Sequence, residues 1–238
     1  MILPNISANV YSIASNNSLK PPKQVKPNDE AVSKKVGLCS FSPQTTWRKV
    51  QAYYYHLRAS RAHQNGQIDQ AEPLYLKSFK LYQAAYGDEH PYVAAILFNL
   101  GDLYQTLKKY PEAENSYLRA YCIEQKGLGE THPKMVQTMQ NLASLYHDAQ
   151  KPKQAREFYQ AVLSAQEKLQ PPDFLALATT ISDLGALLHE QHEFAEAEQC
   201  YQKAIAYFQQ DNNATEVERI SANLQKLKQD MFKQDRTD

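Results

Sequence analysis

The stretch Asn99-Leu100-Gly101-Asp102-Leu103-Tyr104 returns 42 residues later as Asn141-Leu142-Ala143-Ser144-Leu145-Tyr146, and this recurrence decides the fold. Further columns of residues keep the same period: the alanines Ala71, Ala113, Ala155 and Ala197, the tyrosines Tyr75, Tyr117, Tyr159 and Tyr201, and the small residues Ala59, Gly101, Ala143 and Gly185. Small residues let two helices cross closely, and a large ring on the next turn fills the angle between them. The sequence therefore predicts a helical repeat protein.

The residues between the helical segments predict four helix pairs. Turns within the pairs fall at Gly66, Tyr110-Pro111, Lys151-Pro152 and His192-Glu193. Between pairs, Gly87-Asp88-Glu89-His90-Pro91 and Gly129-Glu130-Thr131-His132-Pro133 each join a glycine that ends a helix to a proline that starts one. At the third junction, Pro171-Pro172-Asp173 takes this place. We expect an all-α, right-handed α-solenoid over residues 45–212, with repeats at about 45–86, 87–128, 129–170 and 171–212.

The two ends of the chain differ from the repeats. Residues 1–44 lack periodicity and are rich in Asn, Ser, Pro and Lys, so we expect a disordered tail. Residues 213–232 predict a one-sided helix that caps the open end of the last repeat. Its apolar positions, at spacings of three and four, are Val217, Ile220, Leu224, Leu227 and Met231.

The repeated segments resemble tetratricopeptide repeats, in the long-period form typical of kinesin light chains and related bacterial and plant proteins. Residues 99–104 and 141–146 resemble the signature of that family's first helix, and Ala113-Glu114-Asn115-Ser116-Tyr117 resembles that of its second. The resemblance covers about residues 50–212, and the first repeat departs from the pattern at Arg58 and Ala62. It identifies an architecture and not a ligand.

The resemblance implies that the first helix of each pair lines a concave surface that binds a peptide. The candidate binding residues on this surface are Phe98, Asn99, Asp102, Gln137, Gln140, Asn141, Ser144, His147, Thr179 and Asp183. The full stripes contain no lysine or arginine but four carboxylates, those of Asp102, Asp148, Asp183 and Glu190. We therefore expect the groove to prefer a neutral or basic segment of a protein partner.

Asn99 and Asn141 are the leading candidates, because a side-chain amide offers a donor and an acceptor to the backbone of any extended peptide. The alternative is that each amide only bonds a neighbouring helix. Asp183 replaces the asparagine in the fourth repeat and keeps only the acceptor, which favours a peptide amide or a cation. Phe98 is either the apolar floor of a pocket or a packing residue.

Catalytic, metal and cofactor sites are not expected. His90 and His132 stand one per junction and are interpreted as helix-entry residues, and His189-Glu190-Gln191-His192 lacks the four-residue histidine spacing of zinc proteases. No glycine-rich phosphate loop, apolar membrane span or basic stripe for nucleic acid is present. The amino-terminal stretch does not read as a secretory signal, which favours a cytoplasmic protein.

The leading functional hypothesis is a non-enzymatic scaffold that binds a partner peptide. The alternatives are a secreted bacterial effector that acts on host proteins, and a self-assembling accessory subunit. Residues 1–50 contain seven lysines and arginines against two acids, whereas residues 51–212 contain fourteen against nineteen. The tail is therefore either an intramolecular competitor for the groove or a solvated linker, with Trp47 packed on the first helix.

Overall fold

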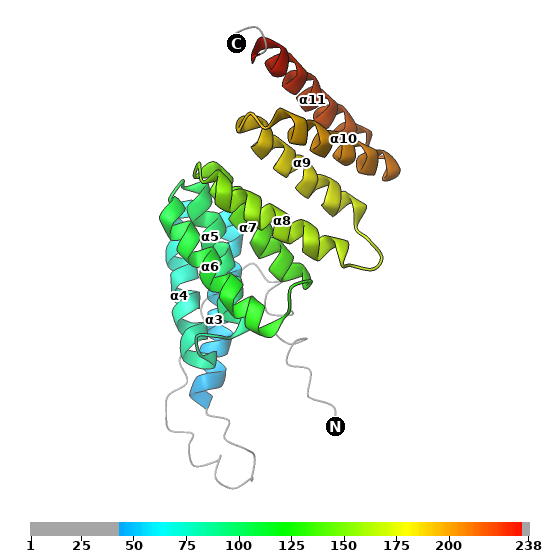
Figure 1. Cartoon of the computed structure of the whole chain (residues 1–238). Coiled ribbons are helices and arrows are strands. Elements are labelled where there is room, and N and C mark those ends of the chain that lie inside the picture. The colour runs from blue at the N-terminus through cyan, green and yellow to red at the C-terminus, as the bar shows by residue number, and fades with distance from the viewer. Residues whose placement is uncertain (1–42, 235–238) are drawn as a thin grey trace.

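The computed structural model describes residues 43–234, and all regular secondary structure within them is α-helical (Figure 1). The helices are α3 (Pro43–Gln64), α4 (Ile68–Tyr86), α5 (Pro91–Thr106), α6 (Tyr110–Gly127), α7 (Pro133–Asp148), α8 (Pro152–Glu167), α9 (Phe174–Glu190), α10 (Phe194–Gln210) and α11 (Ala214–Gln234). Helices α3 to α10 form four consecutive pairs, and α11 follows the last pair. Residues 1–42, nearly all of the predicted tail, lie outside the described range.

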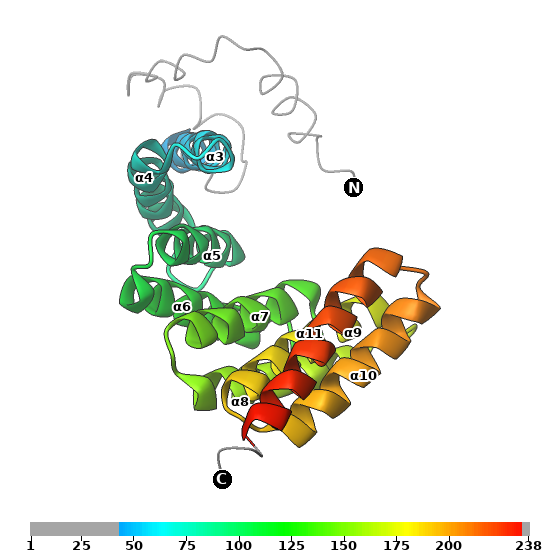
Figure 2. The same ribbon diagram turned by 90° about the horizontal axis from the view of Figure 1, so that it is seen from above.

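The helix pairs follow one another along an arc, so the protein is an α-solenoid (Figure 2). Along this arc, α5 packs against both α3 and α7, and α11 packs against α9 and α10. The second helices α4, α6 and α8 lie on the outer side (Figure 2). The first helices therefore form the inner, concave face.

Residues at the helix entries and turns explain how the pairs are connected. Nδ1 of His90 accepts a hydrogen bond from the backbone N–H of Tyr92, and Nδ1 of His132 accepts one from Lys134, both at 3.2 Å. Both histidines are thus N-caps, which confirms them as helix-entry residues. The turn inside each pair needs one residue in the left-handed region, with φ of 72° at Gly66, 57° at Lys108, 55° at Gln150 and 61° at His192.

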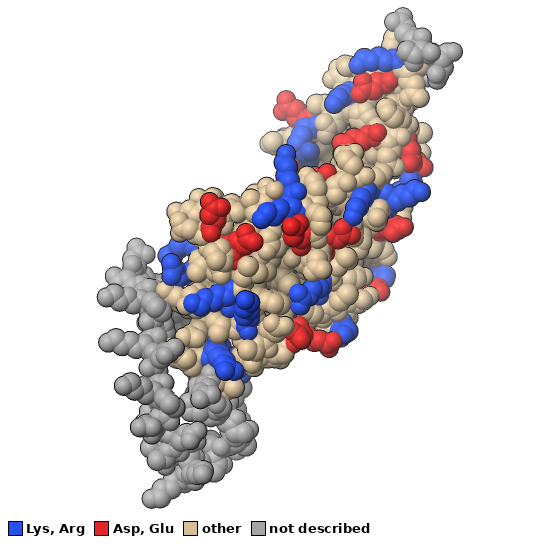
Figure 3. Space-filling model, turned by 90° about the vertical axis from the view of Figure 1, so that its left-hand side faces the viewer, with Lys and Arg blue, Asp and Glu red and all other residues tan. Residues whose placement is uncertain are grey.

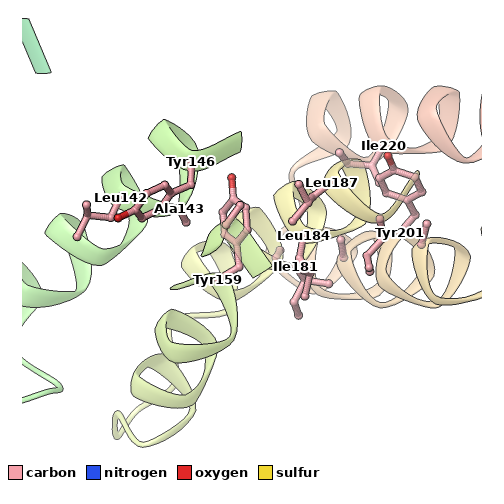
Figure 4. Packing of buried hydrophobic residues seen from close by; sticks show 14 of the residues in the cluster. Leu142, Ala143, Tyr146, Tyr159, Ile181, Leu184, Leu187, Tyr201 and Ile220 are labelled. Carbon is pink, nitrogen blue, oxygen red and sulfur yellow. The ribbon is translucent and has the colours of Figure 1, made fainter. Parts of the chain in front are cut away.

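The periodic tyrosines and small residues meet inside each pair. Tyr75, Tyr117, Tyr159 and Tyr201 are all at most 4% exposed. A Cβ added to Gly101 would lie 2.6 Å from the ring of Tyr117, which is why a glycine stands there. Further along the chain, Figure 4 shows leucines of α9 between Tyr159 of α8 and Tyr201 of α10. Each pair therefore buries apolar surface against its neighbours, as a solenoid requires.

Candidate functional site

The ten predicted binding residues lie on α5, α7 and α9. Helix α5 carries Phe98, Asn99 and Asp102, α7 carries Gln137, Gln140, Asn141, Ser144 and His147, and α9 carries Thr179 and Asp183. Asp102 and Gln137 are exposed and the other eight are half-buried. Each residue therefore keeps some surface that a ligand can reach.

The two candidate asparagines use their amide nitrogens within the protein. Nδ2 of Asn99 donates to Nε2 of His56 at 3.0 Å, and Nδ2 of Asn141 donates to the hydroxyl of Tyr117 at 3.1 Å. Burial lowers the pKa of His56, which favours the neutral ring that this bond requires. Neither Oδ1 atom has a hydrogen-bond partner among the described residues. A structural role for the nitrogen and a binding role for the oxygen are therefore compatible.

Phe98 and Gln140 both contact neighbouring elements. The ring of Phe98 meets that of Tyr117 edge to face, with centroids 5.8 Å apart. Nε2 of Gln140 donates to Oγ1 of Thr180 on the next first helix at 3.2 Å. Both side chains therefore support the inner face as well as forming part of it.

A column of side chains near the carboxyl ends of the first helices joins each repeat to the next. The column has the 42-residue period and consists of His63, Gln105, His147 and His189. Its side-chain contacts are His63 with Asp102 at 3.8 Å, Gln105 with Asp148 at 2.7 Å, His147 with Glu190 at 2.8 Å, and His189 with Asp230 at 3.3 Å. The first three contacts join two successive first helices and the fourth joins α9 to α11, so the column helps to set the spacing of these helices. Sequence reasoning missed it, because the partners depend on side-chain rotamers.

Asp183 occupies the asparagine position of the fourth repeat but behaves differently from Asn99 and Asn141. Its carboxylate has no hydrogen-bond partner among the described residues. Burial raises the pKa of Asp183 to about 6, and the positive charge of Arg219 partly opposes this rise. Above pH 6 the carboxylate is ionised and can only accept hydrogen bonds. A donor from a ligand, either a peptide N–H or a cationic side chain, suits this position.

Helix α11 continues the inner face, which the strict period did not reveal. Its sequence Asn223-Leu224-Gln225-Lys226-Leu227 repeats the pattern of residues 99–103, but Asn223 follows Asp183 by 40 residues instead of 42. Burial supports this alignment, because Ile220 and Leu227 are fully buried, as are their counterparts Ile96 and Leu103. Asn223 and Lys226 thus take the places that Asn99 and Asp102 have on α5. Because the turn between α10 and α11 is short, at residues 211–213, the residues of α11 do not fall on the 42-residue period.

The outer surface is mixed in charge. On the face shown in Figure 3, basic and acidic side chains are interspersed over the described residues. Some of them pair within one repeat, such as Lys126 with Glu89 and Lys168 with Glu130. None of the helices in residues 43–234 is long and apolar enough to span a membrane.

Comparison with known proteins agrees with the architecture. The family model of the tetratricopeptide repeat matches residues 51–123 and 135–210. Among solved structures, BtubC (BKLC) from P. vanneervenii is similar, with 25% identity, a TM-score of 0.66, and coverage of 77% of this chain and 71% of that chain. No curated protein sequence matches this chain.

Two further structures share the fold at lower identity. A putative kinesin light chain from Podosopora anserina with nearly identical repeats has 18% identity and a TM-score of 0.60, and the match covers 77% of this chain and 97% of that one. Aspartyl phosphate phosphatase F from Bacillus subtilis has 15% identity and a TM-score of 0.68, and the match covers 82% of this chain and 49% of that one. At these identities the likeness concerns the fold alone.

Proposed function

This chain belongs to the tetratricopeptide repeat family, and we propose that it is a non-enzymatic scaffold that binds a segment of a partner protein in its concave groove. The observation that carries the proposal is a line of polar, half-buried side chains along the inner face. The line consists of Asn99, Asn141, Asp183 and Asn223. Side chains of this kind can satisfy the backbone groups of an extended peptide, which need partners when they leave water.

The charge of the groove supports a neutral or basic partner over most of its length. The inner stripes of α5, α7 and α9 present carboxylates at Asp102, Asp148, Asp183 and Glu190 and no lysine or arginine. Complementary charge selects partners and directs their approach more than it adds affinity. A segment with lysine or arginine near α7 and α9 therefore fits better than an acidic one.

Selection from a displayed library of random 12-residue peptides tests this function on the full chain. The wild type is expected to enrich a motif, and the double variant Asn99→Ala, Asn141→Ala is expected to lose it. Asn115→Ala is the matched control, because Asn115 is an exposed asparagine on α6, a second helix. Equal enrichment by the wild type and the double variant, with both folded by circular dichroism, would refute the groove as the binding site.

The basic tail is a proposed competitor for the same groove. The proposal is supported by the charges, since residues 1–50 are basic and the inner face of α5, α7 and α9 is acidic. Replacing the tail lysines Lys20, Lys23, Lys26, Lys34 and Lys35 with glutamine is expected to raise the affinity for a selected basic peptide. An unchanged affinity would leave the tail as a linker. The cytoplasmic location, the exported effector and the self-assembling subunit stay predictions.

A further inference from the structure

A cavity of about 400 Å³ lies between α9, α10 and α11, at the end of the groove. Its wall includes His189 and Glu190 from the inner face of α9 and the rings of Phe194 and Tyr201 from α10. Helix α11 contributes Asn223 and Lys226, the counterparts of Asn99 and Asp102. The cavity is therefore part of the concave face and lies where the line of polar residues ends.

The acidic groups of the cavity wall are already paired. Oε2 of Glu190 is 2.8 Å from Nε2 of His147. The carboxylate of Asp230 contacts His189 at 3.3 Å and Lys233 at 3.0 Å. Lys226 is exposed, and its ammonium group forms no ion pair or hydrogen bond with any residue that the structure describes. Among the lysine and carboxylate groups of the cavity wall, Lys226 is therefore the one without a partner in the described residues.

We propose that this cavity binds an aspartate or glutamate side chain of the partner segment, with Lys226 and Asn223 donating to its carboxylate. Hydrogen bonds from an ammonium group to a carboxylate are among the strong ones, and the asparagine amide supplies a second donor. The rings of Phe194 and Tyr201 offer apolar contact to the methylene groups of such a side chain.

This inference rests on the proposed function and adds the orientation in which the partner segment lies in the groove. The position held by Asp102 on α5 is held by Lys226 on α11, so the charge at this position of the inner face is reversed between α5 and α11. A bound segment is then oriented with its acidic residue at α11 and its neutral or basic residues along α5 to α9. A segment with the reverse order of charges meets like charges at both ends and is rejected.

The test compares Lys226→Glu with Lys228→Glu in the full chain. Lys228 lies on the same helix, and its Nζ is 3.2 Å from Oε1 of Glu198 on α10, outside the cavity. Both variants change the charge equally, so they separate a local from a general electrostatic effect. In the 12-residue library selection, the wild type and Lys228→Glu are expected to enrich an acidic residue at one fixed position. Lys226→Glu is expected to select lysine or arginine there.

Affinities of one selected peptide then check the contact directly. Its affinity is expected to fall about tenfold or more for Lys226→Glu, and similarly when the acidic residue of the peptide is replaced by its amide, because a charged contact is lost. Lys228→Glu is expected to bind within about twofold of the wild type. Circular dichroism and thermal unfolding verify that all three proteins are folded.

Three results would overturn the inference. A wild-type motif without a positioned acidic residue would overturn it and leave the scaffold function standing. If the affinity depends on the free carboxyl terminus of the peptide but not on its acidic side chain, the cavity binds a terminal carboxylate and not a side chain. The absence of any enriched motif on the wild type would overturn both the inference and the proposed function.

Discussion

The second and third repeats contact the repeat before them through the same set of residues, whereas the fourth repeat makes an equivalent contact through different residues. In the first two junctions a lysine pairs with a glutamate of the preceding repeat, Lys109 with Glu72 at 3.9 Å and Lys151 with Glu114 at 2.7 Å. The hydroxyls of Tyr104 and Tyr146 donate to these same two glutamates at 3.1 Å.

At the third junction the charges are exchanged. Arg156 stands in the column of Glu72 and Glu114, and it donates to Glu193 at 2.7 Å and to Glu196 at 2.6 Å. The position equivalent to Tyr104 and Tyr146 is Leu188 in the fourth repeat. Arg156 cannot accept a hydrogen bond, so a tyrosine hydroxyl would have no acceptor there. A complementary charge pair is therefore present at all three junctions, although the residues that form it differ.

The packing of glycine against tyrosine separates the second repeat from the fourth most strongly. A Cβ at Gly101 would lie 2.6 Å from the ring of Tyr117, whereas one at Gly185 would lie 3.1 Å from that of Tyr201. Gly101→Ala is expected to lower the free energy of unfolding by about 3 kcal/mol, because Tyr117 is fully buried and cannot move away. Gly185→Ala is expected to change it by less than about 1 kcal/mol, since the helix propensity of alanine offsets a milder contact. Urea unfolding of both variants measures the difference, and equal losses would contradict it.

Reversal of the charge at Arg156 tests the exchanged junction. Arg156→Glu brings three carboxylates together and is expected to lower the free energy of unfolding by about 2 kcal/mol, through like-charge repulsion in a partly exposed site. Adding Glu193→Lys restores the glutamate–lysine arrangement of the other two junctions. It is expected to recover at least half of the lost free energy of unfolding. Thermal unfolding at low and at high salt checks this, because repulsion is weaker at high salt. Failure of the second change to rescue the first would show that complementarity does not decide the register.

Asp183 distinguishes the fourth repeat by its response to pH. Its pKa of about 6 in the folded protein exceeds the ordinary value of 3.8, so the folded state binds the proton more tightly than the unfolded state. The stability from this group is therefore greatest at low pH and is lost as the pH rises through about 6. Asp183→Asn is expected to raise the free energy of unfolding by about 1 kcal/mol at pH 7.5 and to have no such effect near pH 4, because the aspartate is then neutral.

The matched control for this prediction is Asn141→Asp in the third repeat. It places a carboxylate where the amide now donates to Tyr117, and it is expected to lower stability at pH 7.5 more than at pH 4. The charged and titratable groups around Asp183 include Arg219, His147 and Glu216, and the hydroxyls of Tyr159 and Tyr201. A pH profile of unfolding that is the same for wild type and Asp183→Asn would show that another of these groups controls the titration.

The sequence predicted the helix pairs and the buried tyrosine column, because packing at a fixed period leaves a periodic residue pattern, and the family resemblance implied the concave face. It did not reveal that α11 carries Asn223 and Lys226 on the same face, since the spacing from Asp183 to Asn223 is 40 residues and falls outside the 42-residue period. The link between His63 and Asp102, and the others in its column, were equally hidden, because rotamers decide which polar groups meet. The peptide-binding roles of Asn99 and Asn141 stay predictions.

A smaller difference separates the first repeat from all the later ones, at the turn inside each pair. The left-handed residue is Gly66 in the first pair, but Lys108, Gln150 and His192 in the others. A side chain in this conformation places Cβ close to the following carbonyl oxygen, which glycine avoids. Gln150→Gly is therefore expected to raise the free energy of unfolding by about 0.5 to 1 kcal/mol.

Gly66→Ala is the converse experiment at the equivalent turn. A Cβ at Gly66 meets no other atom within 4 Å, so any loss of stability reports the backbone conformation alone. The expected loss is about 1 kcal/mol, similar in size to the gain from Gln150→Gly. A gain in one turn without a loss in the other, measured by urea unfolding of both variants, would mean that contacts of the Gln150 side chain outweigh the strain. Equal and opposite changes would show that the four turns differ only in how well their residues tolerate the left-handed backbone.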